Sequence, residues 1–73
     1  MSYIEFRKAL KSYKITILQI TKILGISHST PTVWRQKQEI PQYAKAWLEL
    51  FQALPKDERV LYIHNKLKEA EKQ

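Results

Sequence analysis

The chain has 73 residues, a formal net charge of +6 and no cysteine. That length is enough for one small domain, and the lack of cysteine excludes disulfides and thiolate metal sites. A cysteine-free chain fits a reducing compartment, so we expect a cytoplasmic location. No apolar run approaches the length of a membrane span and the first residues form no apolar signal region, so we expect no membrane association.

The excess positive charge lies in the first half of the chain. Residues 1–38 carry seven basic side chains and one acid, Glu5, whereas residues 39–73 carry six of each kind. No acid occurs between Phe6 and Gln38. This asymmetry indicates a polyanionic partner, either nucleic acid or an anionic membrane surface, although a basic surface kept only for solubility gives the same pattern.

Two capping-box pairs, a Ser or Thr followed three residues later by Glu or Gln, predict where two helices begin. The pairs are Ser2 with Glu5 and Thr16 with Gln19. They predict helices over residues 3–12 and 17–24. Gly25, the only glycine, ends the second helix as a left-handed residue.

The third helix lies within residues 28–38, and its start depends on Pro31. If Ser27 caps the helix, Pro31 is the fourth helical residue and forfeits a backbone hydrogen bond. If Thr30 caps it, Pro31 takes the favoured first position and the helix runs over 31–38, which is the start we favour.

Prolines mark the starts of the last two predicted helices, over about 41–54 and 56–71. Apolar residues recur at helical spacing in the fourth helix: Ala44, Trp47, Leu48, Leu50, Phe51 and Leu54. A second stripe follows in the fifth helix: Val60, Ile63, Leu67 and Ala70. Five short helices with short connections predict one all-α domain over residues 1–73.

Six residues between positions 21 and 41, in and around the second and third helices, are spaced in a recognisable pattern. The set is Thr21, Gly25, Ile26, Ser27, Trp34 and Pro41. This spacing resembles the helix-turn-helix of the phage repressor and Cro-like (XRE-type) family, with the motif over about 16–38. The resemblance implies a compact, lambda-repressor-like five-helix domain in which Gly25 supplies a positive φ and Trp34 faces inward.

Four positions depart from the family pattern. Thr21 replaces the usual Ala, and Ile17 stands where a phosphate-binding Gln is common. Lys37 stands where a Gly is common, and Pro31 replaces an aliphatic residue. These departures do not change the fold that the resemblance implies. They affect which residues would contact DNA bases and phosphates.

The resemblance implies that the third helix enters the major groove of DNA with its N-terminal, outward side chains. The base-contact candidates are His28, Ser29, Thr30, Thr32 and Val33. The phosphate-contact candidates are Lys14, Thr16, Ser27, Arg35, Gln36 and Lys37. None of the base-contact candidates forms a bidentate Arg–guanine or Gln–adenine pair, and local capping explains the Ser27 and Thr30 hydroxyls equally well.

The implied function is a sequence-specific, double-stranded DNA-binding transcriptional regulator, a repressor that occludes a promoter as a homodimer on a palindromic operator. It would need no cofactor, and His28 and His64 lack companions at metal-ligand spacing. The dimerisation candidates on the last helix are Val60, Tyr62, Ile63 and Leu67.

The alternative is a helical protein-interaction module, an antitoxin-like partner or a phage antagonist, that keeps the scaffold without reading DNA. Pro31 and Ile17 favour this second interpretation. We do not expect an enzyme, because the chain has no Gly-rich phosphate loop, no nucleophile elbow and no His–carboxylate pair at useful spacing.

Overall fold

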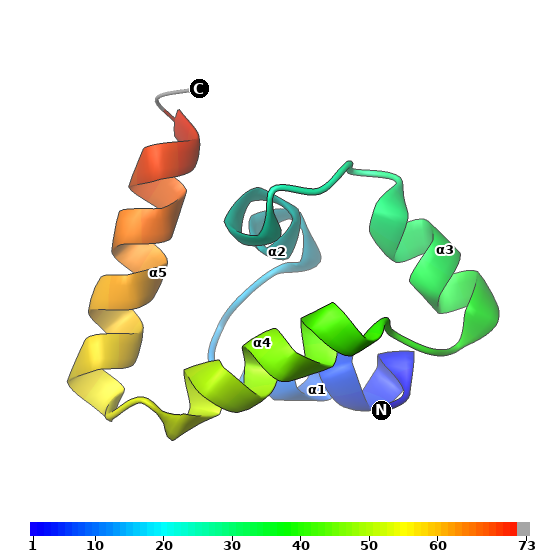
Figure 1. Ribbon diagram of the computed structural model, residues 1–73, viewed down its shortest axis with the longest axis horizontal. Helices are drawn as coiled ribbons and strands as arrows, with labels where there is room; N and C mark the ends of the chain where they lie inside the picture. Colours follow the sequence, from blue (N-terminus) through cyan, green and yellow to red (C-terminus); the bar gives the residue numbers. More distant parts are fainter. Residues whose placement is uncertain (72–73) are drawn as a thin grey trace.

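The computed structural model describes residues 1–71, which form five α-helices. They are α1 (Tyr3–Ser12), α2 (Ile17–Leu24), α3 (Thr30–Lys37), α4 (Gln42–Ala53) and α5 (Lys56–Glu71). In Figure 1, α3 and α5 lie at opposite ends of the molecule, α4 crosses in front of α1, and α2 is seen nearly end-on between them. The all-α class and the five helices expected from the sequence are confirmed.

Local side-chain bonds begin the first two helices where the capping pairs predict. The Ser2 hydroxyl accepts a 3.1 Å hydrogen bond from the Glu5 amide. At α2 the box is reciprocal: the Thr16 hydroxyl accepts from the Gln19 amide at 3.1 Å, and Gln19 Oε1 accepts from the Thr16 amide at 3.0 Å. These bonds satisfy N–H groups that have no partner inside the helix, which explains why the predicted starts are right.

Gly25 ends α2 as predicted, with a φ of 68°. The end of α1 has the same left-handed geometry without a glycine, because Lys14 has a φ of 61°. The Lys14 amide donates to the Lys11 carbonyl and the Ile15 amide to the Leu10 carbonyl, both at 3.0 Å. This pair of bonds is a Schellman motif, and it brings Ile15 into the core beside Leu10.

A second left-handed residue without a glycine, Gln38, ends α3 with a φ of 58°. The Gln38 amide donates to the Arg35 carbonyl and the Glu39 amide to the Trp34 carbonyl, both at 3.2 Å. The N-terminus then pairs with this linker, because the Tyr3 amide donates to the Gln38 carbonyl at 3.3 Å. The chain start and the end of α3 are therefore held together.

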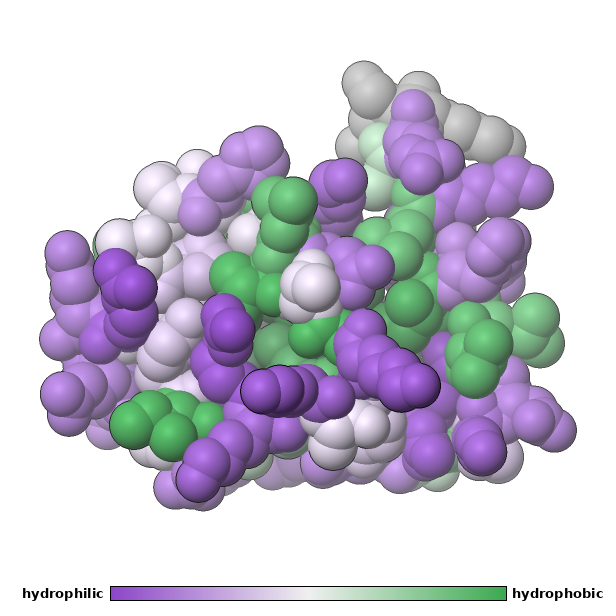
Figure 2. Space-filling view, turned by 180° about the vertical axis from the view of Figure 1, so that it is seen from behind, coloured by the Kyte–Doolittle hydropathy of each residue, from purple (hydrophilic) through white to green (hydrophobic). Residues whose placement is uncertain are grey.

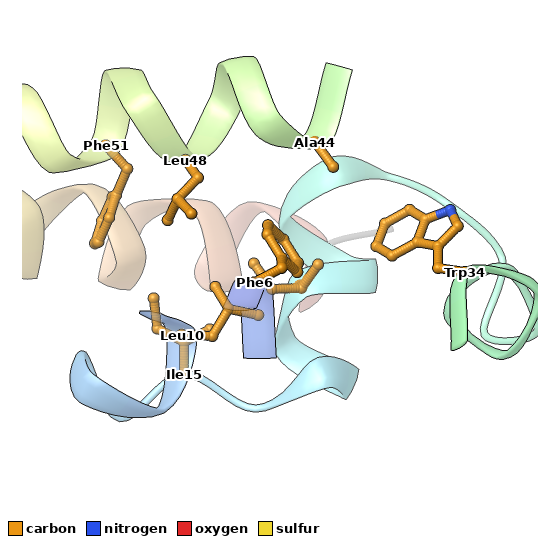
Figure 3. Close-up of a cluster of buried hydrophobic side chains, with 8 residues drawn as sticks. Phe6, Leu10, Ile15, Trp34, Ala44, Leu48 and Phe51 are labelled. Atoms are coloured by element: carbon orange, nitrogen blue, oxygen red, sulfur yellow. The ribbon is translucent and has the colours of Figure 1, made fainter. Parts of the chain in front are cut away.

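One cluster of buried apolar side chains forms the core. Its members are Phe6, Leu10, Ile15, Ile20, Trp34, Ala44, Leu48 and Phe51. Figure 3 shows the α4 side chains facing those of α1, with Trp34 reaching in from α3. The Trp34 ring meets Phe6 edge-on, with centroids 5.9 Å apart, so Trp34 faces inward as expected.

Leu50 lies outside the core. It was grouped with the apolar α4 residues at helical spacing, but 72% of its surface is exposed. The buried α4 residues Ala44, Leu48 and Phe51 follow an i, i+4, i+7 stripe, and Leu50 points away from that stripe.

α5 contributes no fully buried residue. It packs against α2, and its half-buried Tyr62 and Ile63 contact the core. Two hydrogen bonds tie it to α4 and the linker: Trp47 Nε1 donates to the Tyr62 hydroxyl at 2.8 Å, and Arg59 Nη1 donates to the Leu54 carbonyl at 2.9 Å. Within residues 1–71, no helix has the length and apolar character needed to cross a bilayer.

Candidate nucleic-acid interface

The start of α3 differs from both sequence-based alternatives. α3 begins at Thr30, and Ser29 is its N-cap in a right-handed helical conformation with no side-chain cap bond. The favoured start, with Thr30 as the cap, is therefore wrong by one residue. The Ser27 start is also wrong, because the Ser27 hydroxyl contacts only Ser29, accepting from its amide at 3.3 Å and lying 3.0 Å from its hydroxyl. His28 and Ser29 lie in a turn ahead of the helix, as the favoured start implied.

Pro31 is the second residue of α3 and is buried. The first four N–H groups of a helix have no intrahelical partner, so a proline at this position forfeits no helical hydrogen bond. Its ring lies one turn before the buried Trp34 and occupies the inner face of α3. Pro31 therefore fills, as an apolar side chain, the position where the family pattern has an aliphatic residue.

The opposite face of α3 is exposed to solvent. It carries Ser29, Thr32, Val33 and Gln36, at the i, i+3, i+4 and i+7 positions that share one helix face. Gln36 was expected among the phosphate contacts, but it shares this face with the base-contact candidates. We call these four residues the outward face of α3.

Arg35 and Lys37 lie on the two flanks of the outward face, and both are exposed. Lys37 and Val33 also line a hollow of about 330 Å³ between α3 and the start of α4, together with Glu39. Thr30 is half-buried on the side of α3 nearer the core, so its hydroxyl is the least accessible among the base-contact candidates.

Two phosphate-contact candidates precede α2 and are not brought together with α3. Lys14 lines a hollow beside α5 that also includes Arg59 and Val60. Figure 1 shows the link between α1 and α2 on the side of α5, whereas α3 lies at the other end. Thr16 is exposed, and its hydroxyl already accepts the capping bond from Gln19.

The positive charge of the first half is exposed and free of carboxylate partners. All seven of its basic side chains are exposed: Arg7, Lys8, Lys11, Lys14, Lys22, Arg35 and Lys37. Across residues 1–71 the one ion pair joins Lys66 to Glu69 at 3.8 Å, within α5. These seven charges therefore contribute an unneutralised positive field to this half of the protein.

The dimerisation candidates on α5 divide into two groups. Tyr62 and Ile63 pack against the core and Leu67 is half-buried, so all three are at least partly occupied within the protomer. Val60 is 64% exposed. Its neighbour Leu61, which the sequence stripe did not include, is 61% exposed. The free apolar surface of α5 is thus centred on Val60 and Leu61.

Within the described residues, no three His, Asp or Glu side chains gather in a way that would hold a metal ion. No protein-family model, curated protein or solved structure matches this chain.

Proposed function

We propose that this protein is a sequence-specific, double-stranded DNA-binding regulator in which α2 and α3 act as a helix-turn-helix and α3 enters the major groove. The outward face of α3 is the observation that supports this most directly. Its four polar or small side chains are exposed, and the buried Pro31 and Trp34 fix which way they point. Docking such a face places short side chains against base edges.

The chemistry of the outward face matches what base edges offer. The Gln36 amide suits bidentate pairing with adenine, and the Val33 methyls suit contact with a thymine methyl. The Ser29 and Thr32 hydroxyls donate to or accept from several bases. Gln36 is the strongest base-contact candidate, because it lies on this face and its amide can both donate and accept a hydrogen bond.

Phosphate contacts would supply most of the affinity. Arg35 and Lys37 flank the outward face and would meet the DNA backbone on either side of the groove. The other five exposed cations of residues 1–38 supply further attraction. Each phosphate neutralised releases counterions, so affinity should fall steeply as salt is raised.

The proposed assembly is a homodimer formed through Val60 and Leu61 on α5, acting in the cytoplasm as a repressor on a palindromic operator. Because α3 and α5 lie at opposite ends of a molecule 32 Å long, such a dimer puts its two α3 helices at its outer ends. Their separation would exceed one turn of duplex DNA. We therefore expect half-sites spaced by two turns, about 20 base pairs centre to centre.

Selection of bound duplexes from a random library, followed by binding of the recovered sequence at two salt concentrations, tests the proposal. The expected result is a palindrome with two-turn spacing, bound far more tightly than random duplex at both salt concentrations. Recovery of no preferred sequence, with all duplexes bound equally and only at low salt, would reject the DNA-reading function.

That second outcome would favour the protein-interaction module instead. One observation supports this alternative: Ile17 is the first residue of α2, and its side chain packs against the core and has no group that could bind a phosphate. A module of this kind would use exposed apolar residues such as Leu18 and Leu61 to hold its partner.

A further inference from the structure

A hollow of the protein lies away from α3, between the α1–α2 link and the start of α5. Its volume is about 590 Å³, within the range of small-molecule sites. Apolar and aromatic side chains form most of its surface: Tyr13, Ile15, Phe51, Val60 and Ile63. Figure 2, the view from behind, shows hydrophobic side chains gathered beside α5 with hydrophilic ones around them.

The charged residues lining this hollow are all cations. They are Lys14, Lys56 and Arg59, and no acidic side chain lines the hollow within residues 1–71. An apolar surface beside three positive charges is complementary to a molecule with an apolar body and one negative group.

Arg59 is held in place at the hollow before any ligand arrives. Its Nη1 donates to the Leu54 carbonyl at 2.9 Å, and its guanidinium carbon lies 5.1 Å from the centre of the Tyr13 ring. These contacts use one of the five N–H donors and one face of the guanidinium. The remaining donors are free to bind a carboxylate, and the side-chain entropy lost on binding is reduced.

We propose that this hollow binds a small amphipathic organic anion, a carboxylate on an apolar chain or ring. The carboxylate is held by Arg59 with Lys14 and Lys56 beside it, and the apolar body lies against Phe51, Val60 and Ile63. The site lies at the α5 end of the molecule and does not require that the protein bind DNA.

Three probes with the same apolar chain and different charge test the proposal: octanoate, octanol and octylammonium. Amide chemical shifts recorded during titration of the full chain locate each probe and give its affinity. Octanoate should bind about fivefold or more tightly than octanol, and octylammonium should bind most weakly. The shifts should centre on Tyr13, Lys14 and Val60.

Two similarly exposed apolar residues, Val60 and Ile4, provide a matched pair of variants. Val60→Glu places a carboxylate at the hollow and should weaken octanoate binding by about fivefold or more. Ile4→Glu adds the same charge at a residue of α1 that is 62% exposed and does not line the hollow, so octanoate affinity should stay within about twofold of the parent.

A variant that removes two of the positive charges provides a second test if Val60→Glu fails to fold. Replacing Lys14 and Lys56 together by Gln should weaken octanoate binding, although Arg59 still holds the carboxylate, and should leave octanol binding unchanged. Equal affinity for the three probes would overturn the proposal, as would shifts centred away from the hollow. Unaltered octanoate binding by a folded Val60→Glu variant would overturn it as well.

Discussion

The indole nitrogen of Trp47 donates a 2.8 Å hydrogen bond to the Tyr62 hydroxyl, which joins α4 to α5. Tyr62→Phe leaves this partly buried N–H without its partner, so we expect the free energy of unfolding to fall by about 1–2 kcal/mol. Urea denaturation measures the change. Tyr43→Phe is the control, because Tyr43 is 49% exposed and should change stability by no more than about 0.5 kcal/mol. Equal effects of the two variants would show that the bond contributes nothing.

Pro31 should stabilise α3 through its buried ring. Pro31→Ala removes apolar surface from the interior and restores freedom to the unfolded chain, and both changes lower stability. We expect a loss of about 1–2 kcal/mol in thermal or urea unfolding. Thr32→Ala, at the next and exposed position, should lie within about 0.5 kcal/mol of the parent protein. A more stable Pro31→Ala protein would mean that the proline strains the helix start.

Lys14 should be replaceable by glycine with a gain in stability. A side chain at a φ of 61° is strained, and glycine adopts this conformation freely. After the extra entropy of the unfolded glycine is subtracted, Lys14→Gly should raise the free energy of unfolding by about 0.5 kcal/mol. Lys11→Gly, in the last turn of α1, is the opposite case and should lower stability by about 0.5–1 kcal/mol. Destabilisation by both variants would contradict the left-handed geometry at Lys14.

The proposed dimer should depend on Leu61. Leu61→Glu puts a charge on each side of a two-fold interface, and we expect the dimer dissociation constant to rise about tenfold or more in sedimentation equilibrium. Ile4→Glu is a matched control, because Ile4 is 62% exposed but lies on α1, near the other end of the molecule. A parent protein that stays monomeric at high micromolar concentration, with and without DNA, would remove the dimer from the proposal.

Gln36 and Arg35 should affect DNA binding in different ways. Gln36→Ala should cost about 1–3 kcal/mol on the selected duplex and relax preference at one base pair in each half-site. Arg35→Ala should weaken binding to all sequences by a similar factor and reduce the salt dependence by about one phosphate contact. Competition binding against base-substituted duplexes separates the two. A strong change of sequence preference in Arg35→Ala would place that side chain on a base edge.

The sequence predicts those parts of the fold that depend on neighbouring residues. The bounds of α1, α2 and α5 follow from capping pairs, Gly25 and flanking prolines, because each of these acts within a few residues of itself. The left-handed Lys14 and Gln38 were not predicted, since neither is a glycine and nothing in their side chains indicates the conformation. Their geometry depends on the packing of the residues that follow.

The candidate site was predicted in outline and misread in detail. The exposed segment around α3 was identified from spacing, but Gln36 was assigned to phosphate because it comes late in the helix, and its place on the outward face was missed. Leu50 was included in the apolar stripe of α4, and Leu61 was missed as an exposed apolar residue of α5. Helical spacing shows only that apolar residues recur on one side of a helix, whereas the neighbouring helices decide which of those residues are covered. The Trp47–Tyr62 bond spans fifteen positions and has no sequence signal.

Five of the eight residues of α3 are exposed and only Pro31 and Trp34 are buried, whereas residues 44–48 in the middle of α4 are all buried or half-buried. Few buried apolar contacts mean that a segment opens locally at a free energy below that of global unfolding. The amide protons of α3 therefore exchange with solvent sooner than those in the middle of α4. The helix proposed to read DNA is thus a segment whose backbone can adjust to the groove that it enters.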